Sequence, residues 1–406
     1  METAQSKKKQ NLLLFMCWLI YVASYVSRYS YNANIVAVKE YYKVTNSVTG
    51  LVSTFFFFAY GAGQIINGIM CKRYNKKLFL SMPLIISAFI NLYLFTRPPI
   101  EAYKYLWLLN GLSLSVLWSL LLLTLSENLD ESHLTSAMVV MSSTVAVGTV
   151  LSYGASSLFN LIADFRYSFL FGFITAGAVA VIWIFSCDKL TAKETHIREE
   201  EVLKEPEKKA NFFVKATLIL FGLFMIIVNL VKDGLNTWVP QILKDTYNFG
   251  DSLSIILTLT LPLLGLFGAA FVVFVNKLIK NDVMINCLLF FMAGLCVFGV
   301  MTLLNTKSFA VAVIILFGII SLLMHAINSF ITSFIPLKFR KNFNSGLLAG
   351  ILNGCGYVGS TLSAYCLGLI ADNGGWNGVF ILLTVLCGAT VVISLLFSIF
   401  AAKKLK

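Results

Sequence analysis

Charged residues are scarce in this chain, and the scarcity decides its class. Only 12% of the 406 residues are Asp, Glu, Lys or Arg, whereas 58% are hydrophobic. A soluble domain has about 25% charged residues, because its surface faces water. The mean hydropathy of +0.83 is likewise too high for a soluble protein. We therefore expect an all-α polytopic membrane protein.

Residues that build catalytic or metal centres are few and scattered. The three histidines, His133, His196 and His325, lie far apart in the sequence. None of the eight cysteines forms a close pair of the kind used in metal or redox sites. The chain also lacks a glycine-rich loop of the type that holds ATP phosphates. We therefore expect no enzymatic activity, no catalytic residue, no metal and no cofactor.

Apolar segments of helix length are abundant instead. A transmembrane helix needs about 20 predominantly apolar residues, and the sequence contains twelve such segments. We place them at 12–37, 46–70, 78–96, 103–125, 136–159, 167–187, 212–242, 252–275, 283–303, 308–333, 345–371 and 376–401.

Basic residues are distributed unevenly between the predicted loops. The net charge of +12 would suggest nucleic-acid binding in a soluble protein. If both termini are cytoplasmic, most Lys and Arg fall in the inner loops, which is the bias typical of membrane proteins. We therefore expect a multi-pass, monomeric protein of the cell membrane with cytoplasmic termini and no nucleic-acid partner.

The longest polar stretch divides the spans six and six. It covers residues 188–211, has mixed charges and is typical of a solvated cytoplasmic linker. The predicted domains are thus 1–187 and 212–406, joined by this linker. Two six-helix halves are typical of transporters built from internal repeats, with the substrate site between the halves.

Two basic residues lie deep in predicted spans, Arg28 in the first and Lys232 in the seventh. A guanidinium stays protonated at accessible pH, so Arg28 must face a polar cavity or a counter-ion. The alternative is that it snorkels to the membrane boundary. Tyr25 and Asn32 lie on its helical face. Because both cations lie at similar depth in corresponding spans, pseudo-symmetry is expected to bring them face to face.

Asp233 is the only carboxylate deep in a predicted span, and it adjoins Lys232. Two fixed cations in a closed cavity repel unless something negative lies beside them. A purely structural Lys232–Asp233 pair is one explanation. The other is an anionic substrate, with Asp233 releasing Lys232 when the anion arrives.

Further polar side chains inside the spans are candidates for substrate contact, although such residues also make hydrogen bonds between helices. His325 is the group among them that titrates nearest neutrality, so it is also a candidate proton carrier. The candidates are Asn236, Trp238, His325, Asn353 and Tyr357.

Three segments together resemble a known family. They are SYVSRYSYNANI in the first span, KDGLNTWVPQIL in the seventh and GLLAGILNGCGYVGS in the eleventh. They resemble the major facilitator superfamily, and within it the organophosphate:phosphate antiporters, which include glycerol phosphate and hexose phosphate transporters. The resemblance implies twelve transmembrane helices in two pseudo-symmetric six-helix bundles. It also implies that Arg28 and Lys232 bind the substrate phosphate.

The chain departs from the family pattern in three places. In the loop GQIINGIMCKRYNKKL, which contains Gly68 and Arg73, Lys72 stands where an aspartate usually braces the gate. No histidine occurs around Val145, where the resemblance would place a substrate-binding one. Lysine at 232 replaces the bidentate fork of an arginine with a point charge, which loosens the case for phosphate.

These observations predict a secondary active transporter of an anionic small metabolite that works by alternating access. Exchange of an organic phosphate for inorganic phosphate is the leading prediction. Proton- or sodium-coupled symport of an organic carboxylate such as a sugar acid is the alternative, followed by a non-transporting sensor with the same fold. The expected partners are the small anion and the lipid bilayer.

Overall fold

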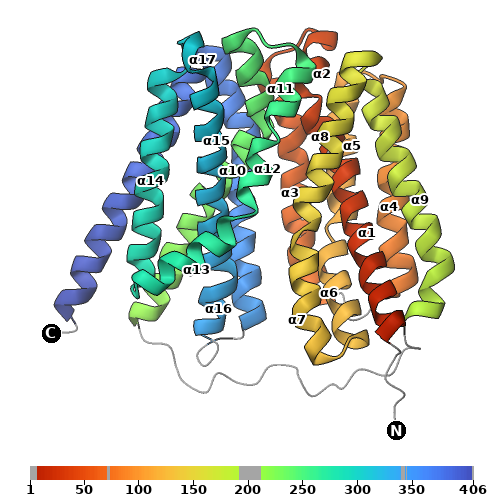
Figure 1. Ribbon diagram of the computed structural model, residues 1–406, viewed down its shortest axis with the longest axis horizontal. Coiled ribbons are helices and arrows are strands. Elements are labelled where there is room, and N and C mark those ends of the chain that lie inside the picture. Colours follow the sequence, from red (N-terminus) through yellow and green to blue (C-terminus); the bar gives the residue numbers. More distant parts are fainter. Residues whose placement is uncertain (1–6, 71–73, 192–211, 340–342, 344, 405–406) are drawn as a thin grey trace. The chain divides into compact units, whose positions relative to one another are not determined.

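The computed structural model describes residues 7–70, 74–191, 212–339, 343 and 345–404. All regular elements in these residues are helices (Figure 1). The first part of the chain forms α1 (Lys7–Ala33), α2 (Ile35–Tyr42), α3 (Asn46–Met70), α4 (Lys76–Phe95), α5 (Ile100–Leu114), α6 (Leu117–Asn128), α7 (Glu131–Ser142), α8 (Thr144–Ile162) and α9 (Arg166–Leu190).

The second part continues the helical pattern. It forms α10 (Phe212–Tyr247), α11 (Asp251–Leu257), α12 (Thr260–Gly265), α13 (Gly268–Leu278), α14 (Asp282–Leu303), η3 (Lys307–Phe309), α15 (Ala310–Ser329), η4 (Phe330–Phe334), α16 (Ile335–Lys338) and α17 (Ser345–Lys404). The predicted all-α membrane fold is confirmed, because the described residues contain 11 helices long and apolar enough to cross a bilayer.

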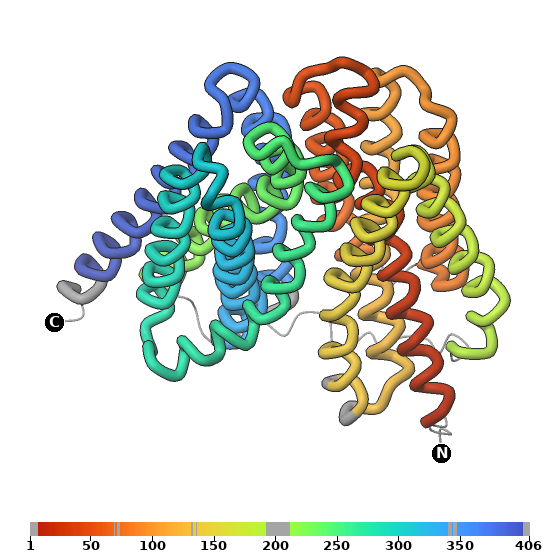
Figure 2. The backbone as a smooth tube through the Cα atoms, turned by 45° about the horizontal axis from the view of Figure 1, so that its top comes forward, coloured from red at the N-terminus to blue at the C-terminus, as the bar shows by residue number. Residues whose placement is uncertain are grey.

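The longest helix accounts for the last two predicted spans. α17 has 60 residues and is interrupted by Gly375, whose φ of 65° lies in the left-handed region. Figure 2 shows the chain reversing direction within this blue segment before it reaches the C-terminus. Two membrane crossings therefore lie within α17, one on each side of Gly375.

Several spans that the sequence predicts as single helices are broken. Proline explains two of the breaks, because it has no N–H to donate to the carbonyl four residues earlier. Pro262 interrupts the ladder at Thr258, between α11 and α12. Pro336 does so at Thr332, which lies in the five-residue π-helix η4. The hydrophobic pattern continues through both breaks, so it does not reveal them.

The chain divides into two compact units. Unit 1 comprises 1–42, 55–201 and 251–256, and unit 2 comprises 43–54, 202–250 and 257–406. The beginning of α3, up to residue 54, thus belongs to unit 2, whereas the rest of that span belongs to unit 1. Residues 251–256 of α11 belong to unit 1, whereas the rest of that span belongs to unit 2. Of the predicted linker, only 188–191 lie within the described residues, and the predicted domain limits stay a prediction.

Unit 1 is built around α1, which packs against α4, α8 and α9. Polar side chains join these helices inside the core. Ser87 donates to Ser27 at 3.0 Å, and Ser30 donates to Asn91 at 2.7 Å. Such hydrogen bonds supply helix association where lipid offers no polar partner. They hold α1 in a fixed position and rotation, with Arg28 in the same stretch.

Unit 2 is held mainly by the packing of α10 against α17. The helices approach closely at Gly359, where an added Cβ would lie 1.9 Å from the carbonyl oxygen of Ile226. Small residues permit such backbone contact in membranes. This close approach places Asp233 of α10 within reach of Ser360 of α17.

Each unit has an ion pair that joins its third and fourth spans, counted within that half of the chain. In unit 1, Lys76 at the start of α4 pairs with Glu127 near the end of α6. In unit 2, Asp282 at the start of α14 pairs with Lys338 at the end of α16, at 2.5 Å. An ion pair therefore joins the third and fourth spans in each half, but the basic residue is on the third span in unit 1 and on the fourth span in unit 2.

Candidate functional site

Arg28 is the buried cation of unit 1, and aromatic rings surround it. Arg28 is 8% exposed. The guanidinium carbon lies 4.2 Å from the ring centroid of Tyr25, 5.1 Å from Tyr29, 5.3 Å from Phe56 and 5.2 Å from Tyr60. Cation–π attraction of this kind strengthens when the cation is desolvated. The four rings thus stabilise a charge that lipid alone would not.

Two helices supply this aromatic cage. On α1, Tyr25 lies three residues before Arg28, and Tyr29 follows it directly, so the three side chains are close together. On α3, Phe56 and Tyr60 are one turn apart and stack at 5.6 Å. The sequence predicted Tyr25 beside Arg28 but not the other three rings. Asn32, also predicted, is buried one turn beyond Arg28.

The rings of the cage belong to a longer aromatic row along α1. Tyr21 contacts Trp118 of α6 at 4.9 Å and Tyr25 at 5.2 Å. At the other end Tyr29 meets Tyr153 of α8 at 6.0 Å. Tyr and Trp combine an apolar face with a polar tip. The row therefore gives Arg28 surroundings that contain both apolar ring faces and polar groups.

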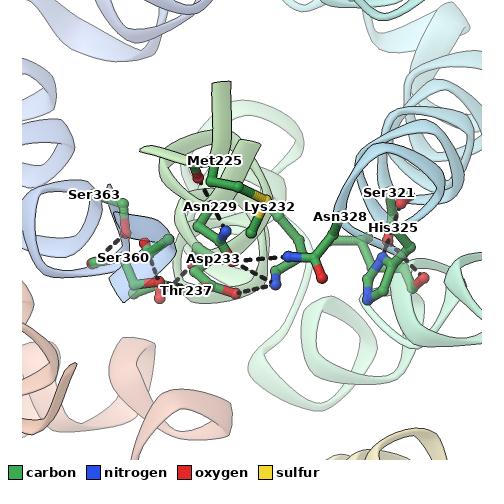
Figure 3. A network of polar contacts seen from close by, with 12 residues as sticks. Met225, Asn229, Lys232, Asp233, Thr237, Ser321, His325, Asn328, Ser360 and Ser363 are labelled. Carbon is green, nitrogen blue, oxygen red and sulfur yellow. Dashed lines mark hydrogen bonds and ion pairs between the residues drawn. The ribbon is translucent and has the colours of Figure 1, made fainter. Parts of the chain in front are cut away.

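The second cation, Lys232, is partly buried and lies in a polar network of unit 2 (Figure 3). Its Nζ donates to Oδ1 of Asn229 at 2.7 Å, and Asn328 of α15 also donates to that oxygen, at 3.5 Å. Nζ lies 3.7 Å from Oδ1 of Asp233. The other carboxylate oxygen of Asp233 accepts a hydrogen bond from the hydroxyl group of Ser360.

The distances in this network leave the ammonium of Lys232 with donors to spare. An ammonium has three N–H groups, and within the described residues Lys232 donates one hydrogen bond. The 3.7 Å contact with Asp233 is an ion pair but is too long for a hydrogen bond. Because its other N–H groups make no hydrogen bond to the described residues, Lys232 can receive an anion without losing an existing hydrogen bond.

Helical spacing brings the network together on α10. Asn229, Lys232 and Asp233 are at positions i, i+3 and i+4, so they share a face. Gly356 of α17 permits the approach, since an added Cβ there would lie 2.5 Å from Nδ2 of Asn229. Asn229, its donor Asn328, and Ser360, which donates to Asp233, were not among the predicted site residues. The spacing was a usable signal for Asn229.

Two other predicted residues of unit 2 make separate contacts. His325 donates from Nδ1 to the carbonyl oxygen of Ser321 at 2.9 Å, and Figure 3 shows it on the α15 side of the network. Trp238 is 1% exposed and donates to the carbonyl of Ala364 at 3.2 Å. Its ring also contacts Trp376 at 5.8 Å. These contacts pack Trp238 between helices.

The remaining predicted residues are placed as follows. Asn236 of α10 and Asn353 and Tyr357 of α17 are partly buried. Gly68 is exposed near the end of α3. Lys72 and Arg73 lie outside the described residues. Over the parts of the chain that the structure describes, no group of three or more His, Cys, Asp or Glu could hold a metal ion.

Comparison with known proteins identifies the family. The profile of the Major Facilitator Superfamily matches residues 17–347. Sugar phosphate exchanger 3 of Mus musculus is 22% identical over 387 residues, covering 84% of this chain and 78% of its own. Membrane sensor protein UhpC of Escherichia coli (strain K12) is 30% identical over 99 residues, covering 24% of this chain and 23% of its own. Both belong to the organophosphate:phosphate antiporter family, which confirms the resemblance.

Solved structures agree on the fold. A D-xylose-proton symporter superposes with a TM-score of 0.75 at 12% identity, covering 97% of both chains. A bacterial homolog of the human lysosomal transporter Spinster, inward-facing and occupied, gives 0.70 at 14% identity, covering 98% of both. At these identities the likeness concerns the fold alone.

Proposed function

Because the chain belongs to the Major Facilitator Superfamily, we propose that it carries a small anionic metabolite across the membrane by alternating access. The leading assignment is exchange of an organic phosphate for inorganic phosphate. The relatives include a sugar phosphate exchanger, which supports this choice. Arg28 and Lys232 are proposed each to contact the anion during the transport cycle.

The observation behind the proposal is the unused donor capacity of Lys232. In a purely structural ion pair, the ammonium and the carboxylate would lie at hydrogen-bonding distance. Without that contact, the desolvation of the two charges is not compensated, at a cost of roughly several kcal/mol. Here the nearest oxygen of Asp233 remains at 3.7 Å. Ser360 and Asn229 hold the pair apart by hydrogen-bonding to each member. Such an arrangement suits a cation that exchanges one anionic partner for another.

The cage around Arg28 is compatible with the same role. Cation–π contacts place the guanidinium over the faces of the aromatic rings. Carboxylate and phosphate oxygens bind to its N–H edge, often through two parallel hydrogen bonds. We propose that the cage holds Arg28 in position and that its N–H groups contact the anion during the transport cycle.

Coupled symport of an organic carboxylate is the second candidate, and one feature favours it. Lys232 and Asp233 together have no net charge, so the network in unit 2 adds no net positive charge for a dianion. A monoanion such as a sugar acid would suit it better. His325, whose imidazole lies on the neighbouring helix, is the proposed proton carrier in that case.

The two candidates differ in what drives uptake, which vesicles of purified protein can separate. For the exchanger, labelled organic phosphate enters only when phosphate is inside, and an imposed pH gradient has no effect. For the symporter, a pH gradient drives uptake of a carboxylate into phosphate-free vesicles. His325→Gln and Asp233→Asn should then abolish gradient-driven uptake but spare exchange. That second pattern would overturn the leading assignment.

The proposed setting is the cell membrane, with both termini on the cytoplasmic side and the protein acting as a monomer. The excess of Lys and Arg in the loops assigned to the inner side supports this orientation. This orientation can be tested by placing single cysteines near each terminus and labelling intact cells with a membrane-impermeant reagent. Labelling of a terminus would show that it lies outside the cell, contrary to the proposal.

A further inference from the structure

Unit 2 contains a cavity, lined by both polar and apolar residues, that is not part of the Lys232 network. Its volume is about 320 Å³. It lies where α13 leads into α14, opposite η4 and α16. The residues lining it are Asn276, Lys280, Asp282, Phe330, Phe334, Ile335 and Lys338.

The charges around the cavity favour an anion. Two lysines face one carboxylate, and Lys338 already pairs with Asp282 at 2.5 Å. Lys280 is exposed and lines the cavity, so its ammonium can be reached from solvent. Asn276 adds amide N–H groups to the same wall. The Lys338–Asp282 pair joins the two sides of the cavity.

The opposite wall contains the π-helix. Phe330 and Phe334 begin and end η4, and their rings stack with centroids 5.9 Å apart. π-helical turns inside α-helices occur frequently at functional sites. Here Pro336 accounts for the disturbed hydrogen bonding, and the consequence is that two aromatic rings line the cavity beside the lysines.

Exposed apolar side chains adjoin the charged ones in sequence. Leu278 is 70% exposed, two residues before Lys280, and Leu337 is 61% exposed, immediately before Lys338. Phe274, one turn before Leu278, is 57% exposed. Lysines next to exposed apolar residues at the end of membrane helices match a lipid, with a charged head and an apolar tail.

We propose that this cavity binds the phosphate head group of an anionic membrane lipid. Lys280 and Asn276 donate to the phosphate oxygens, and the acyl chains run along the apolar side chains next to them. A bound lipid would bridge α13, α14 and the π-helix. It would therefore resist movement of α15 relative to α14. The proposal concerns a site apart from Lys232 and does not depend on which substrate is carried.

Native mass spectrometry of the full chain in detergent tests the proposal. Titration with phosphatidylglycerol should give saturable binding, tighter than phosphatidylcholine. Lys280→Gln should weaken phosphatidylglycerol binding about tenfold, because one charge-assisted hydrogen bond is lost. Lys277→Gln is the matched control, because Lys277 is exposed like Lys280 and lies three residues earlier but does not line the cavity. It should leave binding within about twofold, because a lysine outside the cavity makes no hydrogen bond to the phosphate.

Three results would overturn the proposal. Unchanged lipid binding in Lys280→Gln would show that the lipid does not bind in this cavity. An equal loss of binding in Lys277→Gln would show that binding depends only on the general surface charge. Inorganic phosphate competing as strongly as the lipid, on a molar basis, would assign the cavity to a free anion instead. None of these readouts requires transport, so they stand apart from a failure of the proposed exchange.

Discussion

Replacing Asp233 with Asn tests whether this carboxylate competes with the carried anion for Lys232. An anion hydrogen-bonded to Lys232 would lie roughly 6 Å from the carboxylate of Asp233. Two like charges at about that distance repel by about 0.7 kcal/mol in water and about 2.8 kcal/mol at an effective dielectric constant of about 20. The side chains are 16% and 13% exposed, so the site lies between these limits.

The substitution removes this repulsion, and with it the ion pair between Asp233 and Lys232. Asparagine has nearly the same shape, and its single oxygen can still accept from Ser360, with the NH2 group then on the side of Lys232. At about 1.4 kcal/mol for each tenfold change, a monoanion should bind about 3- to 100-fold more tightly. A dianion feels about twice the repulsion, so its affinity should rise more. The change should therefore shift preference from carboxylates toward phosphate monoesters.

Calorimetric titration of purified protein with a sugar phosphate and a sugar acid measures both affinities. Asp188→Asn is the control, since that carboxylate is 72% exposed, belongs to unit 1 and pairs with Lys77. It should change neither affinity by more than about twofold. Weaker or unchanged binding of both anions in folded Asp233→Asn protein would refute the reasoning. Asp233 would then be a ligand contact or a structural partner.

Other substitutions test the cage, the packing and the linker. Arg28→Lys removes the planar guanidinium from its four rings and should lower uptake at least about tenfold with normal insertion; Tyr60→Phe, which keeps the ring, should retain most uptake. Gly359→Ala forces α17 from α10 and should lower the midpoint of thermal unfolding by about 5 °C or more, whereas Gly350→Ala, whose added Cβ meets nothing within 4 Å, should not. Replacing 191–205 with a flexible segment should leave uptake intact, and lost uptake at normal expression would indicate gating by the linker.

The sequence by itself determined the fold class and the placement of the spans. In a bilayer each backbone polar group must be satisfied internally, so apolar segments of this length form helices. The breaks at Pro262 and Pro336 were also readable in principle, since proline cannot donate. The π-helix at the second break was not, because the form that a break takes depends on neighbouring helices.

The sequence also singled out Arg28, Lys232 and Asp233. A charge in an apolar helix has a high desolvation cost, so its presence alone indicates a function or a partner. Helical periodicity then identified a neighbour on the same helix, Tyr25. The motif residues Lys72 and Arg73 stay predictions, since they lie outside the described residues.

Only the tertiary structure decided which groups from other helices complete each site. Phe56 and Tyr60 reach Arg28 from α3, and Ser360 reaches Asp233 from α17. Helical periodicity fixes which residues of one helix share a face, but it does not say which face of another helix packs against it. That choice depends on close packing, as where Gly356 leaves room for Asn229. The distance between Lys232 and Asp233, on which the proposed function depends, follows from these contacts and not from their adjacency in the chain.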